Sequence, residues 1–250
     1  MVIQVKNVSL SINQNHILKS INLVVNQGET VVLLGKNGCG KTMLLKTVVG
    51  LYKPNEGTVS VFEKDIYSIS KEEKNKIFRQ TGYVFQKSGL FDSLTIAENV
   101  MFGIQRFKPE NRNAMLEKAV LLLKSTGLDN VEHKLPSELS GGMQKRAGIA
   151  RAIAMEPAML LMDDPTAGLD PVLSDAIADL IIRIRERLNS AIILVTHDLK
   201  IAYKLGHRIG LMHEGRLIEM MTNEEFRTTE NEYIKQFRTG NLEGPIAIFD

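Results

Sequence analysis

Residues 35–42 place glycines, a lysine and a threonine at the spacing G-x-x-x-x-G-K-[ST] of a phosphate-binding loop. The glycines allow successive backbone N–H groups to point at phosphate oxygens, Lys41 brings a positive charge to the β- and γ-phosphates, and Thr42 offers a hydroxyl to Mg²⁺. The pattern predicts that a nucleotide's phosphates contact nine consecutive residues: Gly35, Lys36, Asn37, Gly38, Cys39, Gly40, Lys41, Thr42 and Met43.

The segments on either side of this loop support the same interpretation. Thr30–Leu34 is a short apolar run typical of a buried strand, and apolar residues recur at helical spacing from Met43 to Val49. A helix that begins near Gly40 directs its N-terminal N–H groups and its dipole at the anion. This order of strand, loop and helix argues against a chance match in a glycine-rich turn.

The composition indicates an ordinary globular protein. The 250 residues are 44% hydrophobic and 24% charged, with a formal net charge of +2. Nothing in this balance suggests disorder or a basic surface, so no nucleic-acid partner is expected. No apolar run approaches the roughly 18 residues of a membrane span, and the N-terminus lacks the apolar core of a secretion signal. These features predict a cytoplasmic protein.

The single cysteine lies inside the phosphate-binding loop. It excludes an internal disulfide and any cysteine-based metal cluster. A neighbouring helix N-terminus and Lys41 would lower the pKa of the Cys39 thiol and make it reactive. The alternative, which we favour, is a small residue that simply fits the loop.

The apolar residues are distributed as in an α/β fold. Short segments in the first quarter of the chain alternate apolar and polar residues, which is typical of antiparallel strands with one solvent-exposed face. Helical spacing dominates from Lys71 to Pro157 and predicts an inserted helical lobe. The apolar runs 159–162 and 191–195 then flank a long helical segment, as in a strand–helix–strand unit of a parallel sheet. Ligands of such sheets lie beyond the carboxyl ends of the strands.

Polar residues follow three of the predicted strands. We assign Asp163 to Mg²⁺ and Asp164 to polarising an attacking water, in preference to a plain turn. His197 stands where it can touch the γ-phosphate or the water, although an isolated histidine is usually structural. Gln86 offers an amide oxygen to Mg²⁺, as Thr42 offers its hydroxyl. The expected catalytic residues are Asp164, His197, Gln86 and Lys41.

A second anion-binding helix end is predicted at Ser140, Gly141 and Gly142. The segment that follows, from Met143 to Ala154, is predicted to be a helix that ends before Pro157. Its exposed N–H groups suit an anion, but the chain already has one phosphate loop. We therefore infer that residues 140–143 complete the nucleotide site of a partner subunit.

These motifs, in this order, resemble those of ATP-binding cassette (ABC) ATPases. The corresponding segments are Walker A (35–42), the Q-loop (Gln86), the signature (139–143), Walker B (159–164), the D-loop (167–170, ending at Asp170) and the H-loop (His197). The resemblance implies a P-loop NTPase (RecA-like) core with an N-terminal antiparallel β flank and an inserted helical lobe. It also implies a head-to-tail homodimer that encloses two Mg-ATP, with Ser140, Gly141, Gly142 and Met143 acting in trans.

The same resemblance suggests an ATPase domain at residues 1–238, with its helical lobe near 87–157, and a C-terminal tail at 239–250. The tail is expected to reach the neighbouring ATPase subunit and strengthen the dimer. The alternative is an untethered end.

Three positions depart from the usual family pattern. Asp164 stands where a catalytic glutamate is common and is shorter by one C–C bond of about 1.5 Å, which predicts slower or partner-dependent hydrolysis. Ile12 takes the place of the aromatic residue that stacks on adenine, so an apolar contact is expected there. Met143 replaces the common glutamine of the signature.

The spacing of the motifs favours a transporter subunit among ABC proteins. Gln86 and Ser140 are too close in sequence for the very long coiled coil of relatives in DNA repair, and the chain holds one cassette where translation factors have two. A subunit that docks on a separate integral membrane permease remains, with the helical lobe and residues 88–95 as the expected contact. The protein would then be peripheral, at the cytoplasmic face of the inner (cell) membrane.

Three stretches, 85–95, 136–143 and 236–246, are similar to the ATPase of Mla and Mce-associated phospholipid transporters. The resemblance implies lipid transport, with an Mce-domain lipid-binding protein as a further partner. Two alternatives stay open: the ATPase of a small-solute importer, and a nucleotide-sensing regulator that transports nothing.

Overall fold

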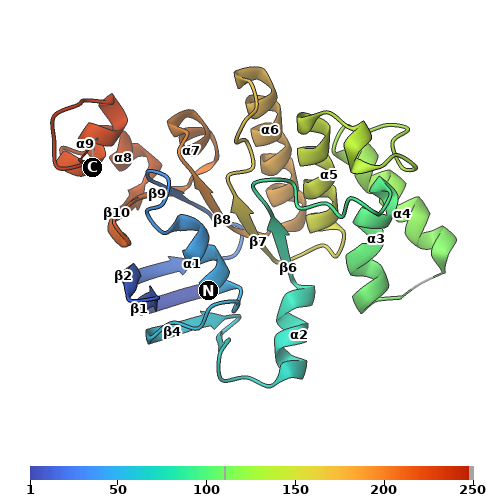
Figure 1. Cartoon of the computed structure of the whole chain (residues 1–250), viewed down its shortest axis with the longest axis horizontal. Helices are drawn as coiled ribbons and strands as arrows, with labels where there is room; N and C mark the ends of the chain where they lie inside the picture. Colours follow the sequence, from blue (N-terminus) through green and yellow to red (C-terminus); the bar gives the residue numbers. More distant parts are fainter. Residues whose placement is uncertain (110, 248–250) are drawn as a thin grey trace. The chain divides into compact units, whose positions relative to one another are not determined.

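The computed structural model describes residues 1–109 and 111–247 and separates into two compact units. Unit 1 joins Met1–Lys71 to Ala191–Asp250, and unit 2 is Glu72–Ser190. The predicted α/β class is confirmed, since strands and helices alternate along most of the chain (Figure 1).

The antiparallel flank predicted at the N-terminus is present in unit 1. Four strands pair in the order β2-β1-β4-β5, and every pairing is antiparallel: β1 (Ile3–Ile12), β2 (Asn15–Val25), β4 (Glu56–Val61) and β5 (Lys64–Asp65). Ile3, Val5, Val8 and Leu10 of β1 are almost fully buried, and most residues between them are half-buried or exposed. This alternation is what one apolar face of a sheet requires.

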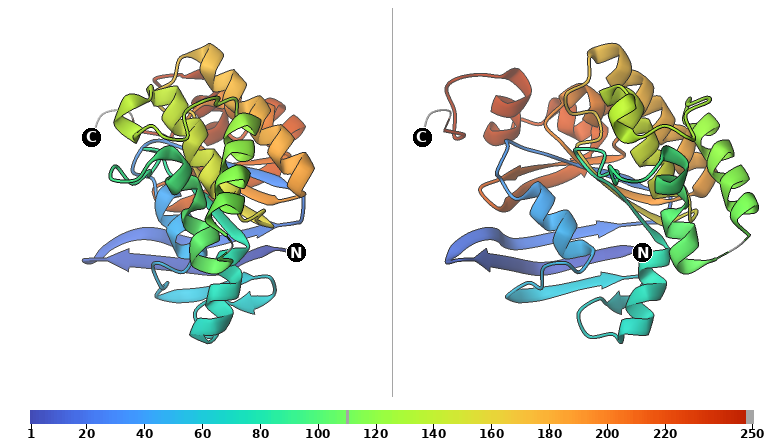
Figure 2. Two further views of the ribbon diagram at one scale, coloured as in Figure 1. Left: turned by 90° about the vertical axis from the view of Figure 1, so that its right-hand side faces the viewer. Right: turned by 45° about the vertical axis from the view of Figure 1, so that its right-hand side comes forward.

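A second set of strands in unit 1 carries the phosphate-binding loop. Strand β3 (Thr30–Leu34) is buried at every residue and pairs in parallel with β8 (Ala191–Thr196) and β9 (Arg208–His213); β10 (Arg216–Thr222) closes the edge antiparallel to β9. A continuous apolar run such as β3 is typical of a strand covered on both faces. Helix α1 (Lys41–Val48) follows β3 and lies beside the antiparallel sheet in both views (Figures 1 and 2).

The remaining helices of unit 1 follow β8 and β10. They are α7 (Leu199–Leu205), α8 (Asn223–Thr228) and α9 (Glu232–Thr239). Asp198, Thr222 and Asn231 cap their N-termini through side-chain oxygens that accept backbone N–H hydrogen bonds. Such capping residues define where short helices begin.

Unit 2 combines a pair of parallel strands with a set of helices, of which α3, α4 and α5 pack side by side (Figure 2). The strands are β6 (Thr81–Val84) and β7 (Met159–Asp163). The helices are α2 (Lys71–Arg79), α3 (Ile96–Phe107), α4 (Arg112–Ser125), the 3₁₀ turn η1 (Pro136–Glu138), α5 (Gly141–Ile153) and α6 (Pro171–Leu188). The range 87–157 expected for the helical lobe lies inside this unit.

A buried asparagine fixes the segment before α3. Asn99 is fully buried, and its amide nitrogen donates to the carbonyls of Phe91, Leu94 and Thr95 while its oxygen accepts from the N–H of Phe91 at 2.7 Å. Thr95 and Glu98 add a reciprocal capping box at the start of the helix. These bonds determine the shape of the loop between residues 88 and 95.

The C-terminal segment folds back onto its own unit as far as residue 247. The amide of Gln236, almost fully buried, accepts from the N–H of Ile246 at 2.7 Å and donates to the carbonyls of Ile246 at 3.0 Å and Asn241 at 3.3 Å. The ammonium of Lys36 donates to the carbonyl of Ala247. Residues 241–247 are therefore tethered, and residues 248–250 of the predicted tail lie outside the described part of the chain.

We predict that Gln236→Ala releases this segment while leaving the cassette folded. Each buried hydrogen bond contributes about 1 kcal/mol, so the loss of three, about 3 kcal/mol in all, should raise local opening at Ile246 on the order of 100-fold. Hydrogen exchange read by mass spectrometry measures that change. Gln80→Ala, at an exposed glutamine whose amide makes one long hydrogen bond of 3.4 Å, is the matched control. Unchanged exchange of residues 241–247 in Gln236→Ala would contradict the tethering.

Candidate functional site

The phosphate-binding loop is closed around the side chain of Lys41. This lysine is the first residue of α1, is only 9% exposed, and donates from Nζ to the carbonyls of Gly35 at 2.6 Å and Lys36 at 2.7 Å. The two hydrogen bonds join the start of the loop to its end, so the loop is already curved. A charge held in this way is available to an anion without further ordering of the chain.

Glycine is required at two positions of this loop. Gly35 has φ 153°, and a Cβ there would lie 2.3 Å from the carbonyl oxygen of Met212. Gly40, which precedes α1, has φ 106°, and its Cβ would lie 2.9 Å from the carbonyl oxygen of Ile17. Neither backbone conformation nor space admits another residue. Backbone carbonyls of β2 and β9 thus lie so close to the loop that they restrict its conformation.

Cys39 behaves as a packing residue in this loop. Its side chain is buried, Sγ lies 3.8 Å from Nζ of Lys41, and its carbonyl accepts from the N–H of Gly215 at 3.1 Å. Burial raises the pKa of the Cys39 thiol above its ordinary value, and the charge of Lys41 only partly offsets this effect. The interpretation of Cys39 as a small residue that fits is therefore favoured over a reactive thiol.

Strand pairing brings His197 to the same edge as the loop. Strands β3 and β8 are parallel neighbours, and Leu34 stands opposite Thr196. The next residues are Gly35 and His197, so both leave the sheet at its carboxyl edge. His197 is exposed there, while Thr42 and Met43 on α1 are half-buried. The predicted phosphate-binding residues and His197 are thus all in unit 1.

The predicted adenine contact lies at the end of an antiparallel strand. Ile12 is half-buried, ends β1 and pairs with Asn15 at the hairpin. The partner strand β2 reaches the phosphate loop at Ile17, whose carbonyl oxygen faces Gly40. This places an apolar side chain on the same strand pair that contacts the loop, and the adenine contact stays a prediction.

A hollow of about 240 Å³ lies next to the loop within unit 1. Its lining comes from the first half of the loop, from the turn between β9 and β10 and from the tethered C-terminal segment: Lys36, Asn37, Gly38, Cys39, His213, Glu214 and Ala247. The tethered segment therefore forms part of the surroundings of the phosphate loop.

Two carboxylates end strand β7 in unit 2. Asp163 is its last residue and Asp164 follows; both are buried, at 8% and 6% exposure. Asp164 has φ 43°, a left-handed conformation that costs a non-glycine residue roughly 1 kcal/mol or more. Strain of this kind persists only where the surroundings impose it.

Gln86 emerges beside Asp164. Strands β6 and β7 are parallel, Val84 stands opposite Met162, and Gln86 and Asp164 each lie two residues further on. The backbone carbonyls of both accept hydrogen bonds from Nζ of Lys145, at 2.5 Å for Gln86 and 3.4 Å for Asp164. Burial lowers the pKa of Lys145, and the carboxylates of Asp164 and Asp163 act in the opposite direction. The motifs in the sequence do not predict a role for Lys145.

The signature segment begins helix α5 as predicted. Ser140 is the N-cap, and its hydroxyl accepts from the N–H of Met143 at 3.3 Å. Gly141 is exposed and Gly142 buried, with Met143 between these extremes. Asp170 of the D-loop likewise caps α6, since its carboxylate accepts from the N–H groups of Val172 and Leu173 at 2.9 and 3.0 Å.

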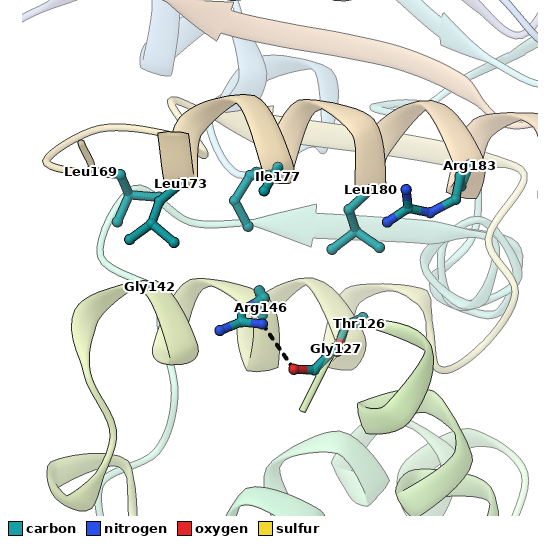
Figure 3. Close-up of a pocket in the computed structure, with 10 residues that line it drawn as sticks. Thr126, Gly127, Gly142, Arg146, Leu169, Leu173, Ile177, Leu180 and Arg183 are labelled. Atoms are coloured by element: carbon teal, nitrogen blue, oxygen red, sulfur yellow. Dashed lines mark hydrogen bonds between the residues drawn. The ribbon is translucent and has the colours of Figure 1, made fainter. Parts of the chain in front are cut away.

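Helices α5 and α6 approach each other at these two motifs. A pocket of about 160 Å³ separates them further along, with apolar side chains of α6 on one wall (Figure 3). Arg146 of α5 closes the opposite side and donates to the carbonyl of Gly127 at 2.8 Å. A Cβ on Gly142 would meet Cδ1 of Leu173 at 3.3 Å, so this glycine permits the close approach of the helices.

Each unit therefore holds a different part of the predicted set of site residues. Unit 1 offers a closed phosphate loop and a histidine, and unit 2 offers two buried carboxylates, an amide and a capped helix end. Within the described residues no group of three or more histidine, cysteine, aspartate or glutamate side chains is arranged to hold a metal ion. The helices described are all too short or too polar to span a membrane.

Comparison with known proteins gives one consistent family. The profile of the ABC transporter family matches residues 18–167. Protein TRIGALACTOSYLDIACYLGLYCEROL 3, chloroplastic, of Arabidopsis thaliana is 35% identical over 98% of this chain and 75% of its own length. The L-cystine import ATP-binding protein TcyN of Bacillus subtilis is 37% identical over 94% of this chain and 92% of its own.

The structural comparison agrees. A dimeric post-hydrolysis structure of the ATP-binding cassette MJ0796, bound to ADP and Pi, superimposes with a TM-score of 0.82. Its sequence is 30% identical, and the match covers 88% of this chain and 98% of that one. This chain belongs to the ABC transporter family, as an ATP-binding subunit that hydrolyses ATP to drive transport.

Proposed function

We propose that this ATPase powers the transport of a phospholipid through a separate membrane permease. The observation that carries a lipid substrate is the similarity over 98% of the chain to a relative named after trigalactosyldiacylglycerol, a galactose-bearing glycerolipid. The phospholipid class rests on the resemblance to Mla and Mce-associated ATPases. The three stretches that resemble Mla and Mce-associated ATPases, at 85–95, 136–143 and 236–246, support it. An Mce-domain lipid-binding protein is then the expected further partner.

The proposed site residues suit Mg-ATP. Thr42, Gln86 and Asp163 offer a hydroxyl, an amide and a carboxylate oxygen, and Mg²⁺ prefers oxygen ligands of these kinds. The bound ion would neutralise charge on the β- and γ-phosphates. Lys41 would hold the same phosphates through its ammonium. Ile12 would contact the adenine ring.

Asp164 is proposed to act on the attacking water. Its carboxylate would accept a proton from the water as the water oxygen bonds to the γ-phosphorus and the bond to the bridging oxygen breaks, leaving ADP and inorganic phosphate. His197 would contact the γ-phosphate from the carboxyl edge of β8. Because aspartate is short, slower or partner-dependent turnover is expected.

Two copies of the chain are proposed to form the active dimer. Ser140, Gly141 and Gly142 lie at the N-terminus of α5, where N–H groups suit an anion, and Gly141 is exposed. In this arrangement, residues 140–143 and Asp170 would approach the phosphate loop of the partner. The MJ0796 cassette, described as dimeric, supports this proposal. The tethered segment beside Lys36 is a candidate for a further dimer contact.

An aromatic surface on unit 2 is the proposed contact with the permease. It surrounds a pocket of about 420 Å³, and Phe85, Phe91 and Phe102 are each more than 40% exposed there. A monomer rarely leaves so many large apolar side chains together on its surface unless they bind a partner. Gly89 and Phe91, two residues of the contact segment 88–95 predicted from sequence, line this pocket.

Arg151 gives this aromatic surface its shape. Its guanidinium lies 5.6 Å from the ring centroid of Phe85 and 6.0 Å from that of Phe91, and it donates to the carbonyls of Gly89 and Ser88. The hydroxyl of Tyr83 is buried beneath and has no hydrogen-bond partner in the described part of the chain.

We predict that Phe102→Ser separates the ATPase from its permease. Phe102 is 46% exposed at the aromatic surface and packs on Phe91 with ring centroids 4.7 Å apart. Loss of this anchor should weaken the complex about tenfold, equivalent to ~1.4 kcal/mol, without changing basal ATP hydrolysis. Affinity capture of the permease from membranes measures the effect. Leu121→Ser, at a leucine of α4 that is 67% exposed, is the control and should bind normally; equal capture by both variants would refute this docking surface.

Two other functions compete with lipid transport. The 37% identity to an L-cystine import protein favours a small-solute importer. A regulator that senses nucleotide without transport is consistent with the short Asp164. In the importer the permease would associate with a solute-binding protein, whereas the regulator would lack a permease.

The partners of the chain decide among these functions. We predict that the chain, captured from gently solubilised native membranes, carries with it a multispan permease and an Mce-domain protein identifiable by mass spectrometry. Phospholipid should be enriched in the captured complex relative to the Phe102→Ser control. A permease accompanied by a solute-binding protein would replace the proposal by solute import, and a capture without any membrane protein would favour the regulator.

A further inference from the structure

Lys145 is a buried lysine of unit 2, and none of the motifs predicted from the sequence gives it a role. It lies on α5, five positions after Ser140, and is only 7% exposed. Lysine is rarely buried unless its ammonium has partners. The partners are the backbone carbonyls of Gln86, at 2.5 Å, and Asp164, at 3.4 Å.

These two carbonyls belong to the segments that carry the proposed chemistry. Gln86 follows β6 and Asp164 follows β7, at matching positions of a parallel pair. Asp164 is also held at φ 43°, so its peptide groups are turned away from the direction of the strand. A donor fixed on α5 keeps the carbonyl of this strained residue in one orientation.

We propose that Lys145 is a positioning residue for ATP hydrolysis. Its ammonium fixes the backbones of Gln86 and Asp164 relative to α5, the helix that begins at the signature. The inference rests on the proposed roles of these residues. Because α5 is a continuous helix from Gly141 to Ile153, Lys145 moves with the helix end that is proposed to meet the partner's nucleotide. When this helix end closes on the partner's nucleotide, Lys145 thereby transmits the movement to Asp164, the carboxylate proposed to act on the water.

The effect expected of such a residue differs from that of a residue that only fills space. Misplacing Asp164 by a fraction of an ångström slows the chemical step, since catalysis depends on the geometry of the reacting groups. Binding of ATP itself depends mainly on the phosphate loop. Removal of the ammonium should therefore lower kcat far more than it changes KM for ATP.

The test is Lys145→Met in the full chain, which keeps the length of the side chain and removes its three donors. We expect kcat to fall about tenfold or more, with KM for ATP changed less than about threefold. Lys145→Gln, which keeps one donor group, should recover part of kcat. It also replaces Lys145→Met in the comparison with wild type if thermal unfolding shows that Lys145→Met is not cooperatively folded. Lys124→Met, at an exposed lysine of α4, is the control and should match the wild type.

The possible outcomes separate this inference from the proposed function. A kcat within about twofold of wild type in Lys145→Met, or equal losses of kcat in Lys145→Met and Lys145→Gln, would overturn the positioning role. A rise in KM without a fall in kcat would also overturn it. A wild-type chain that does not hydrolyse ATP, alone or with its permease, would instead contradict the proposed function on which the inference rests.

Discussion

The hydrogen bonds from the ammonium of Lys41 to the carbonyls of Gly35 and Lys36 are the constraint on which the rest of the site depends. They close the phosphate loop before any ligand is present, and they require a backbone that only glycine adopts at residues 35 and 40. The buried strand β3 and helix α1 are then the elements that hold the two ends of this loop. A preformed anion site avoids the entropy cost of ordering a loop on binding.

A comparable constraint operates at the carboxyl ends of β6 and β7. Parallel pairing brings Gln86 and Asp164 to the same edge, and the ammonium of Lys145 joins their backbones. Asp164 keeps a left-handed conformation that aspartate rarely adopts. A carboxylate that is both buried and held in this conformation is a candidate for function, because the surroundings must offset the cost of the backbone strain.

Much of this arrangement could be predicted because it depends on local sequence. The loop 35–42, the strand before it and the cap at Ser140 follow from spacing and residue type, as does the antiparallel flank. Lys145, by contrast, depends on a contact between segments 59 positions apart along the chain, and its periodicity on α5 suggested nothing unusual. The aromatic surface around Arg151 is not predicted for the same reason, since side chains from separate elements converge there. The tether at Gln236 spans only ten positions, but it is made to backbone groups of an irregular segment, which no residue pattern predicts.

Every role proposed for the site requires that the loop closed by Lys41 binds the triphosphate. Isothermal titration of ATP with Mg²⁺ into the full chain and into Lys41→Met tests it most directly, with thermal unfolding to show that both are folded. We predict that the wild type binds and that Lys41→Met binds at least about tenfold more weakly, a loss of ~1.4 kcal/mol or more. Equal affinity in the two proteins would contradict the claim and place the nucleotide elsewhere.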